Sequence, residues 1–179
     1  MNDNLEKWDN VKINFLEYFW SNSFFGAKNE KNLPYLIKKC DLFNDFSEIE
    51  LFDLIKYMNI RNFSAGEQIF HQDDYGIGFY LILSGSVLLE KNEEESLCLY
   101  PKMYFGEKNL LLEKSRVGLN IKAQEKCVLA SILIPDLDNM IDKKPRVAVK
   151  FIKALSKISL QRLEAIENRI NQITEESKV

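Results

Sequence analysis

A series of short segments with period-two alternation, between residues 60 and 133, constrains the fold of this chain most. Segments of this length, rich in Val, Ile, Leu, Phe and Tyr, are typical of half-buried strands. Turn residues separate them, for instance Ala65-Gly66, Ser84-Gly85 and residues 73–76. Strands so short and so closely spaced predict a jelly roll or a small barrel. The expected strands are Ile60–Phe63, Gln68–Phe70, Gly78–Leu83, Val87–Glu90, Leu97–Tyr100, Leu119–Ala123 and Val128–Leu133.

Helical patterns precede the strands. Residues 5–20 are expected to form an amphipathic helix that packs on the main domain or on a partner, and Leu33–Lys39 a short helix. Ser47 and Glu50 fit a capping box that begins a third helix, running through about Met58. The expected apolar face of that helix consists of Ile49, Phe52, Leu54, Ile55 and Met58.

Two further helices are expected after the strands. The first begins at residues 134–136 and ends near Ile141, and the second begins at Pro145 and ends near Thr174. A seam of apolar residues continues along the second helix beyond the point where a small barrel can cover it. This seam predicts a two-stranded coiled coil in a homodimer, with a helix folded back on its own domain as the alternative. The seam consists of Leu163, Ile166, Ile170 and Ile173.

The segment FGEKNLLLEKSR, residues 105–116, gives the strongest indication of function. Gly106 allows the backbone to approach a ligand closely, and the amides of a following helical turn can meet a phosphate. Arg116 can neutralise that phosphate with paired donors. Glu107 would be repelled by the phosphate unless it accepts hydrogen bonds from hydroxyls such as those of a ribose. Phosphate and ribose together indicate a nucleotide.

The same segment resembles the phosphate-binding cassette of cyclic nucleotide-binding domains. The family pattern is Phe-Gly-Glu, two small or apolar residues, Leu, five variable residues and Arg. The positions that fall in register are Gly106, Glu107, Leu110 and Arg116. Residues 69–87, IFHQDDYGIGFYLILSGSV, resemble the family's second signature, in which a strand and a glycine-containing turn precede a strand ending in Ser-Gly. The resemblance covers roughly residues 41–165.

This resemblance implies a mainly β fold with flanking helices: a jelly roll (double-stranded β-helix) with N-terminal helices and a long C-terminal helix. The implied organisation is an N-terminal helical extension over residues 1–40, a cyclic nucleotide-binding-like β-roll over residues 41–143, and a long helix, the candidate dimer coiled coil, over residues 144–179.

The resemblance also implies a role for each cassette residue. Arg116 would bind the exocyclic oxygens of a cyclic phosphodiester, and Glu107 would accept from the ribose 2′-hydroxyl. Family members that prefer cGMP often carry Thr after the arginine, whereas Val117 has no hydroxyl, so cAMP is expected to be preferred over cGMP. Lys108 and Asn109 are also expected at the ligand, with their amides facing the phosphate. They stand where the family has an apolar and then a small residue, and Asn109 adds bulk beside the ligand.

A further departure lies in the turn of the second signature. Asp73 stands where family members usually carry glycine. Aspartate tolerates a left-handed backbone better than most residues, so the turn is expected to survive the change.

Composition excludes several other classes of function. A net charge of −3 and a pI near 5.4 give no general attraction to nucleic acid or anionic lipid. The single histidine, His71, is expected at the surface. With no second histidine and no suitable cysteine cluster, a metal site lacks ligands, and one histidine without a nucleophile motif supports no catalytic set. The chain is therefore expected not to be an enzyme. Cys40, Cys98 and Cys127 are expected to be reduced thiols in a cytoplasmic protein. The sequence predicts no signal peptide, membrane span or DNA-binding helix-turn-helix.

Two hypotheses about function follow. In the first, the chain is a stand-alone cyclic nucleotide sensor in signal transduction, and its ligand shifts the position of the long helix, which an effector protein recognises. In the second, the domain is degenerate and serves as a dimeric interaction module that binds no nucleotide.

Overall fold

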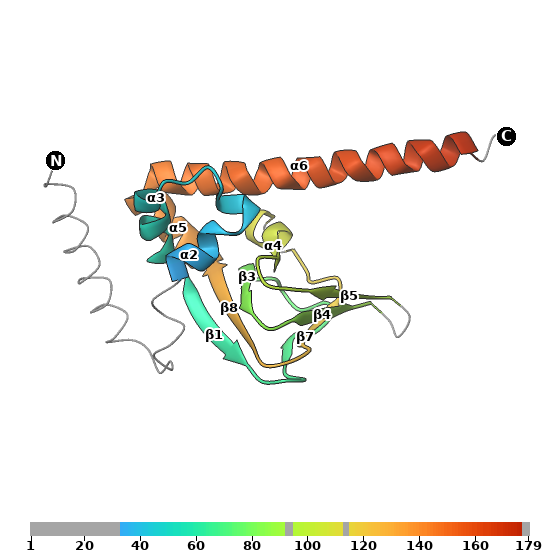
Figure 1. Cartoon of the computed structure of the whole chain (residues 1–179), viewed down its shortest axis with the longest axis horizontal. Coiled ribbons are helices and arrows are strands. Elements are labelled where there is room, and N and C mark those ends of the chain that lie inside the picture. The colour runs from blue at the N-terminus through green and yellow to red at the C-terminus, as the bar shows by residue number, and fades with distance from the viewer. Residues whose placement is uncertain (1–32, 92–94, 113–114, 177–179) are drawn as a thin grey trace, which may run out of the picture. The chain divides into compact units, whose positions relative to one another are not determined.

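The computed structural model describes residues 33–91, 95–112 and 115–176 (Figure 1). The chain divides into two compact units, Met1–Leu33 and Pro34–Val179. The elements below belong to the second unit, except that the first helix begins at Leu33. The amphipathic helix expected over residues 5–20 lies outside the described residues.

The β-roll consists of two antiparallel sheets of four strands each. The first sheet has the strand order β1-β8-β3-β6 and the second has the order β2-β7-β4-β5. The strands are β1 (Asn59–Phe63), β2 (Gln68–Phe70), β3 (Gly78–Ser84), β4 (Val87–Glu90), β5 (Ser96–Leu99), β6 (Tyr104–Phe105), β7 (Asn120–Ala123) and β8 (Cys127–Leu133). The jelly-roll expectation is confirmed, and only the two-residue strand β6 lacked a period-two signal in the sequence.

Helices precede and follow the sheets, as expected, and one short helix lies between β6 and β7. They are α2 (Leu33–Lys38), the 3-10 helix η2 (Asp41–Phe43), α3 (Glu48–Ile55), α4 (Glu107–Leu111), α5 (Ile134–Lys143) and α6 (Pro145–Glu176). The long C-terminal helix α6 packs along α5, α3 and η2 (Figure 1).

Strand β3 contributes to two apolar layers because its successive side chains point to opposite faces. Tyr80 and Ile82 enter the cluster between the two sheets, where they join Val87 and Ile121 of the second sheet. Phe79 points the other way and meets Phe151 of α6 edge-on, with 5.5 Å between the ring centroids. The strand is therefore buried on both faces, and it fixes the start of α6 against the β-roll.

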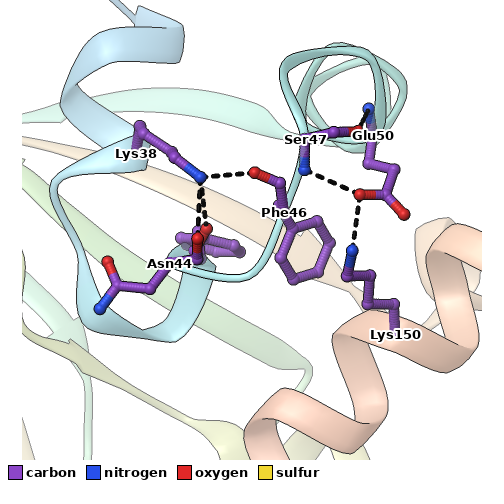
Figure 2. A network of polar contacts seen from close by, with 7 residues as sticks. Lys38, Asn44, Phe46, Ser47, Glu50 and Lys150 are labelled. Atoms are coloured by element: carbon purple, nitrogen blue, oxygen red, sulfur yellow. Dashed lines mark hydrogen bonds and ion pairs between the residues drawn. The ribbon is translucent and has the colours of Figure 1, made fainter.

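A polar network joins the helices that pack on the Phe79 side of β3 (Figure 2). The Lys38 ammonium group donates to the main-chain oxygens of Phe43, Asn44 and Phe46, which satisfies carbonyls around the end of η2. The Glu50 carboxylate accepts from the Ser47 amide at 2.8 Å.

The same carboxylate ties α3 to α6. Lys150 Nζ lies 2.6 Å from Glu50 Oε2. This hydrogen bond from Lys150, helped by the one from the Ser47 backbone, lowers the pKa of Glu50 to about 2.

The structure confirms the capping box but corrects the rest of that helix. Helix α3 ends at Ile55, and Ile49 is 67% exposed rather than part of the apolar face. Leu51 is buried in its place, together with Leu54. The packing of α6 against α3 selects the buried face, and the sequence of α3 alone did not reveal that neighbour.

The three cysteines are free thiols, and Cys40 and Cys127 are buried. No group of three or more His, Cys, Asp or Glu side chains that could hold a metal occurs within residues 33–91, 95–112 and 115–176. Among the helices of those same ranges, none combines the length and the apolar character needed to cross a membrane.

Candidate functional site

The cassette begins where β6 meets α4. Gly106 caps α4 with φ of 85°, a left-handed conformation that favours glycine. A Cβ at this position would lie 2.3 Å from the main-chain oxygen of Gly78 on β3. Glycine is therefore required here for two independent reasons, backbone conformation and the close approach of β3.

The turn before β3 is joined to the end of the cassette by main-chain hydrogen bonds. The amide of Asp73 donates to Val117 O at 2.8 Å, and the amide of Val117 donates to Asp74 O at 2.9 Å. The Gly76 amide donates to Ser115 O at 3.0 Å. Asp73 adopts φ of 68°, so aspartate does take the left-handed conformation expected of this turn. These bonds bring the two sequence signatures together at one place.

Arg116 is exposed and is held against this turn. Its Nη1 donates to Asp73 O at 2.6 Å and its Nη2 to the Tyr75 hydroxyl at 3.1 Å. The guanidinium carbon lies 4.4 Å from the centroid of the Tyr75 ring, within cation–π range. Because a guanidinium carries five N–H donors, these two bonds leave donors for an anion.

Glu107 faces the long helix. Its Oε1 lies 2.7 Å from Nη1 of Arg162 on α6, and its side chain is 22% exposed. The Arg162 guanidinium also lies over the ring of Tyr104, 4.9 Å from the centroid. Burial raises the pKa of Tyr104 to about 12, while the nearby positive charge of Arg162 acts in the opposite direction. The carboxylate expected to bind a ribose is therefore also the link between cassette and long helix.

Lys108 and Asn109, the two departures from the family pattern, point to different surroundings. Lys108 is exposed. Asn109 packs against Gly76 so closely that a Cβ at position 76 would lie 2.0 Å from Asn109 Cγ. Asn109 Oδ1 is buried and accepts no hydrogen bond from the described residues. The bulk expected of Asn109 is thus directed at the turn.

Val117, expected beside the base, is 4% exposed and belongs to the cluster between the sheets with Tyr80 and Phe105. The main chain of Val117 forms hydrogen bonds with the turn at Asp73 and Asp74, whereas its side chain packs in the apolar cluster between the sheets. His71 is exposed, as expected, with its Nδ1 3.7 Å from Asp74 Oδ2.

Residues 60–144 match the family model described as the cyclic nucleotide-binding domain. This region belongs to the cyclic nucleotide-binding domain family. Relatives of the domain include a cGMP-dependent protein kinase of Toxoplasma gondii, which is 29% identical over 117 residues, 65% of this chain. The cyclic AMP receptor protein of Thermus thermophilus is 31% identical over 117 residues, 63% of this chain. The chain spans only 12% of the length of the kinase and 54% of that of the receptor protein.

Solved structures agree with the fold of the domain. The regulatory domain of Toxoplasma gondii PKA, crystallised with cAMP, superposes with a TM-score of 0.60 at 20% identity. The match covers 75% of this chain and 51% of that one. At this identity the likeness establishes the fold alone.

Two residues that contact the candidate site, Tyr75 and Arg162, were not identified from the sequence. Tyr75 had no signal beyond its place in a turn, and its contact with Arg116 depends on strand pairing. Arg162 was recognisable in principle, because it follows Phe151 and Leu155 at helical spacing and so shares their face.

Proposed function

We propose that this domain binds a cyclic nucleotide at the cassette and that it prefers cAMP to cGMP. The observation that carries the proposal is the placement of Arg116: an exposed guanidinium with free donors, held beside a cassette that opens with Gly106 and Glu107. One cation and one partly exposed carboxylate in such an arrangement suit a ligand that has both a phosphate and hydroxyls.

Each side chain has a distinct role in the proposal. Arg116 binds the exocyclic oxygens of the phosphodiester with the donors not used by Asp73 and Tyr75. Glu107 accepts from the ribose 2′-hydroxyl through Oε2, since Oε1 faces Arg162. Val117 offers no hydroxyl for guanine, and this supports the preference for cAMP.

The proposal extends to the location, the oligomeric state and the output of the domain. The domain acts in the cytoplasm as a non-enzymatic sensor, pairs as a homodimer through α6, and transmits its ligand state to an effector protein rather than to DNA. The exposed seam on α6 supports the homodimer: Leu163, Ile166, Ile170 and Ile173 are 50–58% exposed.

A second candidate function is a dimeric interaction module that binds no nucleotide. Asn109 favours it, because its side chain occupies the space against Gly76. The contact of Glu107 with Arg162 also favours it, since a ribose hydroxyl would share the carboxylate with that cation.

Calorimetric titration of the full chain with cAMP and with cGMP separates the two candidates. We expect cAMP to bind more tightly than cGMP, and Arg116→Ala to weaken binding at least about tenfold, because a charged hydrogen bond contributes roughly 1.5–3 kcal/mol. Arg146→Ala removes an equal charge from an exposed position outside the cassette and should leave affinity unchanged. Absence of heat from either nucleotide at millimolar concentration would support the interaction module instead.

A further inference from the structure

The outer part of α6 carries an apolar stripe that no described residue covers. Leu160 is 60% exposed, and Leu163, Ile166, Ile170 and Ile173 are 50–58% exposed. In contrast, Phe151 and Leu155, which precede Leu160 by nine and five residues in the same helix, are 0% and 1% exposed. Burial along α6 therefore stops between Leu155 and Leu160.

The spacing of the stripe fits a second copy of the same helix. Leu163 and Ile170 occupy a positions of a heptad repeat, and Ile166 and Ile173 occupy d positions. This seam is short, so the charges that flank it have a large influence on whether, and in which orientation, two helices pair.

Those flanking charges favour parallel pairing. In this register Arg162 is a g residue and Glu167 is an e residue. A parallel coiled coil sets a g residue beside the e residue five positions later in the other helix, so Arg162 meets Glu167 of the second copy. An antiparallel pair would instead bring g residues together, and Arg162 and Arg169 would then face arginines.

Arg162 is already engaged within its own chain, on the side of α6 that faces the β-roll. It lies seven residues after Leu155 and eleven after Phe151, and so continues the face that those residues bury. Its guanidinium contacts Glu107 at 2.7 Å and covers Tyr104. Its side chain is still 52% exposed, so it borders both the β-roll and the seam.

We infer that Arg162 is shared between two alternative ion pairs, one with Glu107 of its own cassette and one with Glu167 of a second copy. Both carboxylates are attracted to the same positive charge, so each one weakens the hold of the other on the guanidinium. Pairing of two helices therefore releases Glu107, and engagement of Glu107 by another donor releases Arg162 for the dimer.

This inference deepens the proposed function. Only its link between ligand and dimer rests on that function. If a ribose hydroxyl binds Glu107, it weakens the hold of the cassette on Arg162, and nucleotide and dimer then favour each other. The competition between the two ion pairs is itself independent of nucleotide and is tested without it.

Sedimentation equilibrium of the full chain at low ionic strength, in the absence of nucleotide, measures the dimer dissociation constant. We expect Glu167→Gln to weaken the dimer about threefold or more, because exposed ion pairs contribute roughly 0.2–1 kcal/mol each and the dimer has two. Glu107→Gln should strengthen the dimer by a similar factor, since it frees Arg162. Glu164→Gln, which removes the same charge from a b position, should change nothing.

Two results would overturn the inference. One is a Glu107→Gln dimer as weak as, or weaker than, that of the wild type. The other is the absence of any dimer at micromolar to millimolar chain concentration, in which case the stripe serves a different partner. A dimer that responds to Glu107→Gln as expected, but not to cAMP, would uphold the shared arginine and reject its link to the nucleotide. Nucleotide binding itself is decided by the calorimetric titration.

Discussion

The side chain of Asn109 lies directly against the backbone of Gly76, so closely that a Cβ at position 76 would come within 2.0 Å of Asn109 Cγ. Thirty-three residues separate the two positions in the sequence, and the hydrogen bond from the Gly76 amide to Ser115 O brings them together. The contact leaves Asn109 Oδ1 buried without a partner among the described residues. A buried acceptor without a donor costs roughly 1–3 kcal/mol.

Asn109→Ala should increase the affinity for cAMP several-fold, because it opens the space beside Gly76. Calorimetry of the variant beside the wild type measures the change. Asn139→Ala, the same change at an exposed position of α5 outside the cassette, serves as the control and should leave the affinity near that of the wild type. Weaker binding by Asn109→Ala would show instead that the amide contacts the ligand.

Gly106→Ala should reduce the free energy of unfolding by more than about 2 kcal/mol, since it combines a left-handed backbone with a clash against Gly78 O. Gly66→Ala is a matched control: φ there is 78°, but nothing lies within 4 Å of the added Cβ. It should cost only about 1 kcal/mol. Urea denaturation of both variants separates the clash from the backbone strain, and equal losses would contradict the close approach.

The Glu50–Lys150 pair should make stability depend on acid. The pKa of Glu50 is about 2 in the folded protein and 4.5 in the absence of partners. A lowered folded pKa means that the stabilisation is complete above the unfolded pKa and is lost as the pH falls from about 4.5 toward 2. Because both side chains are partly exposed, we expect a contribution of about 1 kcal/mol.

Glu50→Gln should accordingly be less stable than the wild type at pH 7 and nearly equal to it at pH 2. Chemical denaturation across this range provides the measurement. Glu48→Gln, an exposed change in the same helical turn, should follow the wild-type curve. A constant difference between Glu50→Gln and the wild type at every pH would assign the loss to packing rather than to charge.

Lys38→Met should destabilise the domain by about 1–3 kcal/mol, because it removes the donor that satisfies the carbonyls of Phe43, Asn44 and Phe46. Methionine keeps the apolar length of the side chain, so the loss reflects the ammonium group. Thermal unfolding of this variant beside Lys39→Met, whose lysine is exposed, gives the comparison. Identical midpoints for the two variants would contradict a structural role for the Lys38 bonds.

Local sequence patterns predicted most of the elements because local physics produces them. Period-two alternation marked most of the strands, and Ser47 with Glu50 marked the start of α3. Two elements were not predicted, the two-residue strand β6 and the 3-10 helix η2. Both are too short to show a period, and they are stabilised by the neighbours onto which they pack.

The candidate site likewise has a part that the sequence predicted and a part that it did not. The spacing of Gly106, Glu107 and Arg116 was enough to propose a phosphate site, because those residues lie within one continuous segment. The partners of these side chains could not be predicted: Tyr75 reaches Arg116 through pairing between distant segments, and Arg162 reaches Glu107 from the long helix.

Period, caps and glycine positions act over a few residues, so strands, helices and the residues that could meet a phosphate were recognisable along the chain. The contacts of Glu107 with Arg162 and of Asn109 with Gly76 arise only when distant segments fold together. Such contacts depend on how segments that are distant in the sequence pack together. The free energy of this packing arises between two surfaces, so neither segment alone reveals it.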